Sequence, residues 1–149
     1  MEYTQDIDID LPRDQVIALF DDPDNLAKWQ EGLQSFEHLT GEPGQPGATS
    51  RLVFLQGRRR IEMIETITAR NLPDSFDGTY DAKGVHNIAE NRFVEVTPGR
   101  TKWVAHNVFE FAGPMKIIGL LFGRTFPKQT MKYMEAFKAF AEHGTEDPR

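Results

Sequence analysis

Glu65 is the residue of this sequence best placed to perform acid–base chemistry. It lies in a strand-like run, residues 59–69, where alternation assigns one face to Ile61, Met63, Glu65 and Ile67. The other face is more polar, so we expect the Glu65 face to point inward. Burial raises the pKa of a carboxyl group towards the range in which it works as a general acid or base. Glu65 is therefore our candidate catalytic residue, and the alternative is a carboxylate that forms a salt bridge or faces solvent at a rim.

Uncharged polar side chains accompany Glu65 at strand positions that the same alternation assigns to the interior. These are Tyr80, Asn87, Asn91 and Asn107. Each needs a hydrogen-bond partner or a water, because a bare polar group is costly to bury. In an enzyme, Tyr80 or Asn107 would orient a carbonyl or hydroxyl group beside Glu65. For the strand that carries Asn91 the opposite facing stays open, although the one that buries Asn91 is preferred.

Mostly aromatic and sulfur-containing side chains would form the rest of the interior wall. The strand alternation and the stripe of the last helix select Met63, Phe76, Phe93, Trp103, Phe109, Phe122, Thr130 and Met134. Thioethers adapt to irregular partners, and such linings are typical of small-molecule pockets. Together with Tyr80, Asn91 and Asn107, these residues are our candidate ligand-binding set. The alternative is that they fill the interior as core and leave no cavity.

Other kinds of reactive site are missing from the sequence. The four histidines (His38, His86, His106 and His143) lack the spacing of a metal site, although His86 and His106 could be cross-strand neighbours. There is no cysteine, no Gly-x-Ser-x-Gly elbow, and no glycine-rich loop of the dinucleotide- or phosphate-binding kind. We therefore expect no metal and no cofactor.

The composition limits the class of partner and the compartment. The chain of 149 residues has a net charge of −6, which argues against nucleic-acid binding, and the run Arg58–Arg60 is expected to be a solvated hairpin tip. With a mean hydropathy of −0.50 and no long apolar run, no integral membrane segment is expected. No signal peptide is visible and cysteine is absent, so we expect a cytoplasmic protein.

The reactive residues must be positioned by an α+β domain that spans residues 1–149. Period-two patterns separated by Gly and Pro turns predict strands at 2–11, 33–39, 49–56, 59–69, 75–82, 85–96 and 100–111. Two short helices are expected after the first strand, beginning at Pro12 and at Asp24. A long helix is expected over 115–142, kinked near Gly123 and Pro127, with a frayed tail over 143–149.

Four local signatures in this order resemble the START-like, or SRPBCC, superfamily, including its polyketide cyclase/dehydratase-like branch. They are Leu11–Val16 after the first strand, Asp21-Asp22-Pro23 followed by Trp29, the loop Gly41–Gly47, and Pro98-Gly99-Arg100-Thr101. The resemblance covers essentially the whole chain. It implies the helix-grip fold, in which a curved antiparallel sheet of about seven strands wraps a long C-terminal helix and a pocket lies between them.

Three functions remain open, because members of this superfamily include ligand carriers, hormone receptors, lipid-transfer domains and aromatase/cyclases. The first is binding of a hydrophobic small molecule, lipid-like or aromatic and polyketide-like, in the pocket. The second is a cyclase/dehydratase-type enzyme that uses Glu65 as acid or base. The third is a protein-interaction module or homodimer with a filled core, which would use the apolar segment 115–126.

Overall fold

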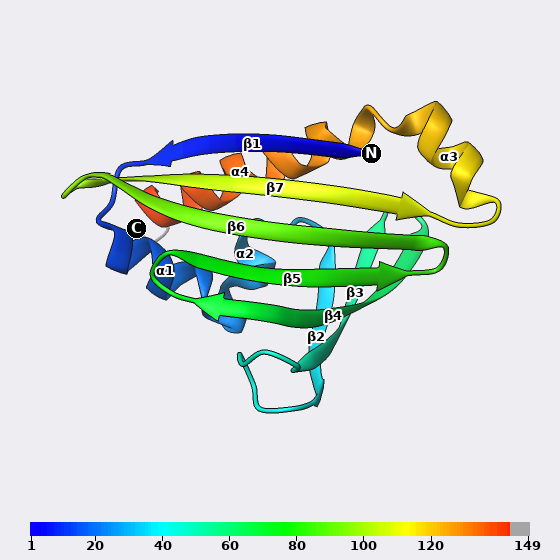
Figure 1. Cartoon of the computed structure of the whole chain (residues 1–149), viewed down its shortest axis with the longest axis horizontal. Coiled ribbons are helices and arrows are strands. Elements are labelled where there is room, and N and C mark those ends of the chain that lie inside the picture. Colours follow the sequence, from blue (N-terminus) through cyan, green and yellow to red (C-terminus); the bar gives the residue numbers. More distant parts are fainter. Residues whose placement is uncertain (144–149) are drawn as a thin grey trace.

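The computed structural model describes residues 1–143, which form a curved sheet and a layer of helices (Figure 1). The strands of this region are β1 (Glu2–Ile9), β2 (Leu33–Thr40), β3 (Thr49–Gln56), β4 (Arg59–Asn71), β5 (Ser75–Ala82), β6 (Val85–Thr97) and β7 (Arg100–Phe111). The helices are α1 (Arg13–Phe20), the 3₁₀ turn η1 (Pro23–Asn25), α2 (Leu26–Trp29), α3 (Met115–Phe122) and α4 (Thr125–His143).

One antiparallel sheet contains all seven of these strands, in the order β1-β7-β6-β5-β4-β3-β2. Strands β2 to β7 pair with their neighbours in sequence, because the short turns between them leave no room for a crossover. Strand β1 pairs with β7, and α1 and α2 lead the chain from that edge of the sheet to the opposite one. The predicted helix-grip architecture and α+β class are confirmed.

The long C-terminal helix expected over 115–142 is in fact two helices. Pro127 lies in the first turn of α4, where its missing N–H is harmless; in a continuous helix its ring would clash with the carbonyl of Gly123. The Thr125 hydroxyl donates to the Phe122 carbonyl over 2.7 Å at the break. His143, expected in a frayed tail, is the last residue of α4, and residues 144–149 lie outside the described residues. No helix within 1–143 is long and apolar enough to span a membrane.

Helix α4 is joined to the sheet and to the first helices by a cluster of aromatic rings. We call Phe20, Trp29, Phe93, Trp103 and Phe137 the aromatic core. The Phe20 ring centre lies 5.0 Å from that of Phe93 and 5.3 Å from that of Trp103. The Trp29 and Phe137 ring centres are 5.1 Å apart. Edge-to-face pairs of this kind contribute about 0.5–1.5 kcal/mol each beyond the burial of area.

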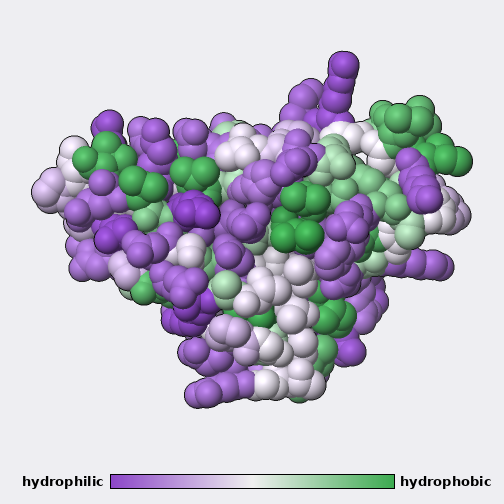
Figure 2. Space-filling model, in the orientation of Figure 1, coloured by the Kyte–Doolittle hydropathy of each residue, from purple (hydrophilic) through white to green (hydrophobic). Residues whose placement is uncertain are grey.

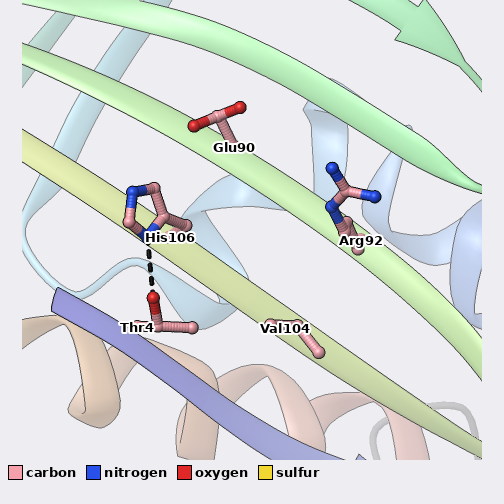
Figure 3. Close-up of a pocket in the computed structure, with 5 residues that line it drawn as sticks. All are labelled: Thr4, Glu90, Arg92, Val104 and His106. Atoms are coloured by element: carbon pink, nitrogen blue, oxygen red, sulfur yellow. Dashed lines mark hydrogen bonds between the residues drawn. The ribbon is translucent and has the colours of Figure 1, made fainter.

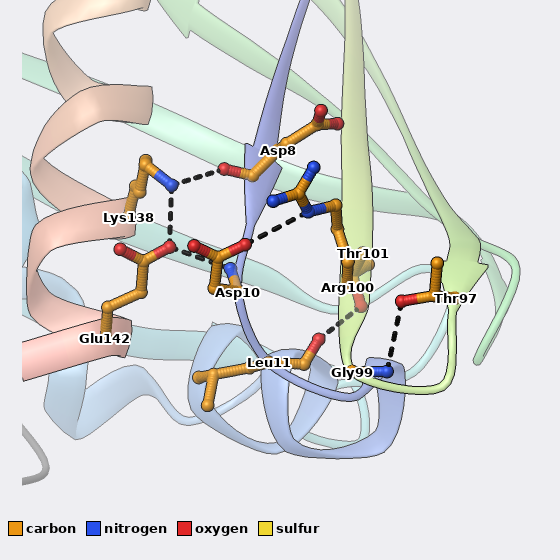
Figure 4. Close-up of polar contacts among 9 residues, drawn as sticks. All are labelled: Asp8, Asp10, Leu11, Thr97, Gly99, Arg100, Thr101, Lys138 and Glu142. Atoms are coloured by element: carbon orange, nitrogen blue, oxygen red, sulfur yellow. Dashed lines mark hydrogen bonds and ion pairs between the residues drawn. The ribbon is translucent and has the colours of Figure 1, made fainter.

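The turn before β7 is fixed to the end of β1 by a buried hydroxyl group. Thr101 is fully buried and its hydroxyl donates to the Leu11 carbonyl over 2.9 Å. On the surface beside it, Arg100 forms an ion pair with Asp10 (Figure 4). The Gly99-x-Thr101 signature therefore holds the first strand and the first helix at a set distance from β7.

A second group of contacts ties the same end of β1 to α4 (Figure 4). One oxygen of Glu142 accepts from the Asp10 N–H at 2.7 Å and from the Lys138 ammonium at 2.6 Å. Lys138 also donates to the Asp8 carbonyl at 2.7 Å. Burial works against ionisation of Glu142, but the Asp10 N–H and the Lys138 charge outweigh it and lower the pKa of this carboxyl group.

A carboxyl group whose pKa is lowered by folding stabilises the protein above its unfolded pKa of about 4.3, and the effect is lost as the pH falls through the folded pKa. We expect Glu142→Gln to reduce the free energy of unfolding by about 1 kcal/mol at pH 7. The deficit should shrink below pH 4, and urea denaturation at several pH values measures it. Glu135→Gln, on an exposed position of α4, is the control. A deficit that is independent of pH would contradict the assignment.

Candidate functional site

A cavity of about 130 Å³ lies between the concave face of β3–β6 and the segment that contains α1, η1 and α2. Strand β2 and the loop Gly41–Gly47 complete its wall, through Phe36 and Pro43 among others. No residue of α4 lines it, so the prediction of a pocket between sheet and C-terminal helix is wrong in this respect. The physical reason is that Met134 and Phe137 of α4 are fully buried against the sheet and leave no space beneath the helix.

The floor of the cavity carries polar side chains from neighbouring strands. His38, Ser50, Glu65, Tyr80 and Asn87 are successive cross-strand neighbours from β2 to β6, and we call them the polar row. The first four line the cavity, His38 from an exposed position at its rim. Because directly paired residues have Cβ atoms about 4.5–5.5 Å apart, each polar group is close to the next. The sheet register therefore assembles residues that are far apart in the sequence.

Glu65 and Tyr80 form the central pair of the polar row. The Tyr80 hydroxyl donates to Oε2 of Glu65 over 2.8 Å. Burial raises the pKa of Glu65, and the hydrogen bond from Tyr80 opposes that rise only in part. Burial, the Glu65 charge and the hydrogen bond all raise the pKa of Tyr80 well above its usual value. Tyr80 therefore stays a donor at neutral pH, and Glu65 is the group that can exchange a proton with a bound molecule.

The indole group of Trp29 offers a further polar contact at the cavity. Trp29 lines the cavity, and its buried Nε1–H has no acceptor among the described residues. The amide of Asn91 is engaged, since it donates to the Phe76 carbonyl at 3.2 Å and accepts from Trp103 at 2.9 Å. A ligand carbonyl would therefore find an unsatisfied donor at Trp29 rather than at Asn91.

The structure brings four of the candidate site residues to the cavity: Glu65, Phe76, Tyr80 and Asn91. Three others, Phe93, Trp103 and Met134, are buried in or against the aromatic core. In β6, Asn91 lines the cavity and Phe93 lies in the aromatic core, so both are on the concave side of the sheet. As cavity wall the prediction was wrong for Phe93 and Trp103, because the rings of Phe20 and Phe137 fill the space in front of them. Met134, on α4, is fully buried and does not line the cavity.

The remaining candidates lie outside the cavity lining. Asn107 is buried and accepts from Asn87 at 3.1 Å. Thr130 is hydrogen-bonded to the Tyr3 hydroxyl at 2.7 Å, which satisfies both groups. Phe109 packs on Phe126 of α4, with ring centres 4.9 Å apart. The other two are Met63, half-buried opposite Leu52, and Phe122, which is 52% exposed on α3.

Several lining residues were not predicted, and they come mainly from the helices and β2. Phe20, Trp29, Phe36 and His38 are the principal ones. The turn that ends α1 and the loop Gly41–Gly47 are visible as signatures in the sequence, but their position over the sheet depends on tertiary packing. In β3, where the facing was undecided, Ser50 lines the cavity and Leu55 is exposed.

Arg70 connects the parts of the cavity wall that do not belong to the sheet. Its guanidinium donates to both carboxylate oxygens of Asp21, at 2.8 and 2.6 Å, and to the Gly44 carbonyl at 3.2 Å. Asp21 and Gly44 both line the cavity. The guanidinium carbon also lies 5.7 Å from the centre of the Phe76 ring. This arrangement, which we call the Arg70 clasp, holds α1 and the loop Gly41–Gly47 together.

A second depression, of about 230 Å³, lies on the convex face of the sheet (Figure 3). It is lined by Thr4, Glu90, Arg92, Val104 and His106, and His106 is hydrogen-bonded to Thr4 at 2.7 Å. His86 and His106, which the sequence allows as cross-strand neighbours, are not paired, since the register places each opposite a glutamate. No group of three metal-ligating side chains occurs within residues 1–143. This face assembles no reactive set comparable to the polar row.

We expect the cavity to open by movement of the loop Gly41–Gly47 when the contacts of the Arg70 clasp are broken. Arg70→Ala removes three hydrogen bonds to Asp21 and Gly44, so we expect amide exchange in the loop Gly41–Gly47 to accelerate roughly tenfold, in keeping with a charged hydrogen bond. Hydrogen exchange with mass spectrometry measures the change. Arg100→Ala, which breaks the exposed pair with Asp10, is the control and should leave this loop unchanged. Equal exchange in both variants would show that the clasp does not hold the loop.

The raised pKa of Glu65 predicts a cost in stability. For a carboxyl group whose pKa rises on folding, the folded protein is most stable below the unfolded pKa of about 4.3. This stability is lost as the pH rises through the folded pKa, because the buried group must then ionise. Glu65→Gln should therefore be more stable than the wild type at pH 8 and equal to it at pH 3.5. Thermal melts at the two pH values test this. Glu62→Gln, on the opposite face of β4, should show no such gain.

Comparison with known proteins places the chain in a family. A family model described as "Polyketide cyclase / dehydrase and lipid transport" matches residues 1–141. No curated protein sequence matches the chain.

Solved structures share the fold at low sequence identity. The aromatase/cyclase Zhui from Streptomyces sp. R1128 is 17% identical, with a TM-score of 0.80 over 98% of this chain and 96% of that one. The protein TTHA0849 from Thermus thermophilus is 13% identical, with a TM-score of 0.80 over 98% and 100%. Thalictrum flavum norcoclaurine synthase is 11% identical, with a TM-score of 0.74 over 98% and 96%. With the match over residues 1–141, the chain belongs to the polyketide cyclase/dehydrase and lipid transport family, a START-like family.

Proposed function

We propose that the chain binds a small apolar molecule that carries a hydroxyl or carbonyl group, in the cavity above the polar row. The observation that carries this proposal is the pairing of an apolar wall, including Phe20, Phe36 and Phe76, with the Glu65–Tyr80 pair on the floor. Pockets of this composition use a few polar groups to orient a mostly apolar ligand. The unsatisfied Trp29 N–H supplies a second point of recognition.

The size and charge of the cavity favour one class of ligand. A volume of about 130 Å³ is close to that of the apolar cavity, about 150 Å³, that holds benzene in an engineered protein. A single ring therefore fits without any movement, whereas an acyl chain needs the Arg70 clasp to open. Glu65 stands on the floor, and Arg70 is already paired with Asp21, so an anionic ligand has no free cation in the lining. We infer a neutral aromatic or polyketide-like ring in preference to a fatty acid.

An enzymatic role is the second candidate, and the Glu65–Tyr80 pair is the observation that favours it. Glu65 would take a proton from the bound molecule or return one to it, while Tyr80 holds the carboxylate in place. The family description and the aromatase/cyclase among the structural neighbours support this class of chemistry. If a substrate is found, Glu65→Gln separates the two roles, because turnover that survives this substitution excludes Glu65 as the acid or base.

Phenol and toluene, which differ by one hydroxyl group, test the binding proposal. At pH 8 we expect phenol to bind more tightly, because its hydroxyl donates to Glu65. In Glu65→Gln the preference should fall roughly tenfold, since a hydrogen bond to a charged acceptor is stronger than one to an amide. Ser50→Leu should abolish binding of both by filling the cavity. Isothermal titration calorimetry measures the affinities.

The matched control is Glu62→Gln, which changes the same charge on the opposite face of β4 and should keep the wild-type preference. Native mass spectrometry of the purified protein supplies an independent readout, because a co-purifying ligand should be lost in Ser50→Leu. If neither probe binds the wild type at millimolar concentration and no ligand co-purifies, the binding proposal fails.

A further inference from the structure

Helix α3 exposes an unusual amount of apolar surface for a helix of eight residues. Leu120 is 85% exposed, Leu121 68% and Ile117 63%, and Phe122 and Ile118 are also exposed. The helix protrudes at the end of β7, and the space-filling view shows a hydrophobic patch at that corner (Figures 1 and 2). Monomeric proteins rarely leave large apolar side chains clustered in this way without a partner.

Two glycines allow α3 to pack closely on the end of the sheet. Gly119 rests on the ring of Phe111, where a Cβ atom would lie 2.7 Å from a ring carbon. Gly84, in the turn between β5 and β6, makes room in the same way for Met115. The two glycines let α3 lie directly on the end of the sheet, so its leucines are directed away from the protein.

The sequence around this helix carries only positive charge, although the chain as a whole has a net charge of −6. No acidic residue occurs between Glu110 and Glu135, a stretch that contains Lys116, Arg124, Lys128 and Lys132. Lys132 forms an ion pair with Glu31, whereas the other three have no ion pair with any residue of the described chain. Lys83, beside Gly84, is likewise unpaired within residues 1–143. Lys116 within α3 and Arg124 just after it therefore place unpaired cations next to the apolar side chains in the chain.

We propose that α3 inserts its apolar side chains into the surface of an anionic lipid bilayer. Exposed Leu, Ile and Phe side chains flanked by Lys and Arg are the composition of helices that lie at the boundary between headgroups and acyl chains. A second copy of the chain suits the patch less well. At 1.5 Å per residue α3 is only about 12 Å long, and a stable protein interface buries about 800 Å² on each partner. This proposal is independent of what the cavity binds.

Vesicle flotation tests the proposal with two lipid compositions, phosphatidylcholine alone and phosphatidylcholine with phosphatidylglycerol. The wild type should float with the anionic vesicles and much less with the neutral ones. Lys116→Gln/Arg124→Gln should weaken the partition by more than tenfold, since each surface cation contributes roughly fivefold. Leu120→Ser/Leu121→Ser should abolish it. Both pairs are exposed, so circular dichroism melts should match the wild type.

Two matched controls show whether the site is specific. Val94→Ser/Val96→Ser removes exposed apolar side chains from β6, and Arg58→Gln/Arg59→Gln neutralises the hairpin tip; both should bind like the wild type. Absence of binding to anionic vesicles, or equal losses in the controls, overturns the proposal. So does a dimer in analytical ultracentrifugation that Leu120→Ser/Leu121→Ser dissociates, because the patch would then belong to a second copy.

Discussion

The ring of Phe20, at the end of α1, is the contact on which both layers of the molecule depend. It lies against Trp29 of α2, Phe93 and Trp103 of the sheet, and Phe137 of α4, and it also lines the cavity. One side chain therefore sets how far the helices stand from the strands. On the α4 side of this ring the interior is filled, and on the α2 side the cavity remains. The position of the Phe20 ring therefore separates the filled core from the cavity.

The two halves of the site are held by different forces. The floor is part of the sheet ladder, so the spacing of Glu65 and Tyr80 is set by backbone hydrogen bonds and changes little with occupancy. The cover consists of short helices and a loop, joined through one ion pair between Arg70 and Asp21. A rigid floor beneath a cover with few contacts allows ligands of different outline to meet the same polar groups.

The strands, and the facing of β4, β5 and β7, could be predicted from the sequence, because period-two alternation and Gly or Pro turns are local signals. The inward positions of Glu65, Phe76 and Tyr80 follow from that pattern alone. The pattern of β3 left its facing undecided. The location of the cavity could not be predicted in this way. It depends on Phe20 and Trp29 meeting Phe137 across more than 100 residues of chain, and no local pattern encodes that contact. Likewise, the cross-strand order of the polar row depends on register, which alternation leaves undetermined.

Both tryptophans of the chain stand at the boundary between core and cavity. Trp29 lines the cavity, and the Trp103 indole donates to Asn91, which lines it too. Their ring planes are nearly perpendicular, at 89°, with centres 5.9 Å apart. Tryptophan fluorescence of this protein therefore originates at the cavity wall and in the core directly behind it. An occupant whose absorption overlaps the indole emission will quench this fluorescence, so a search for such ligands needs no added label.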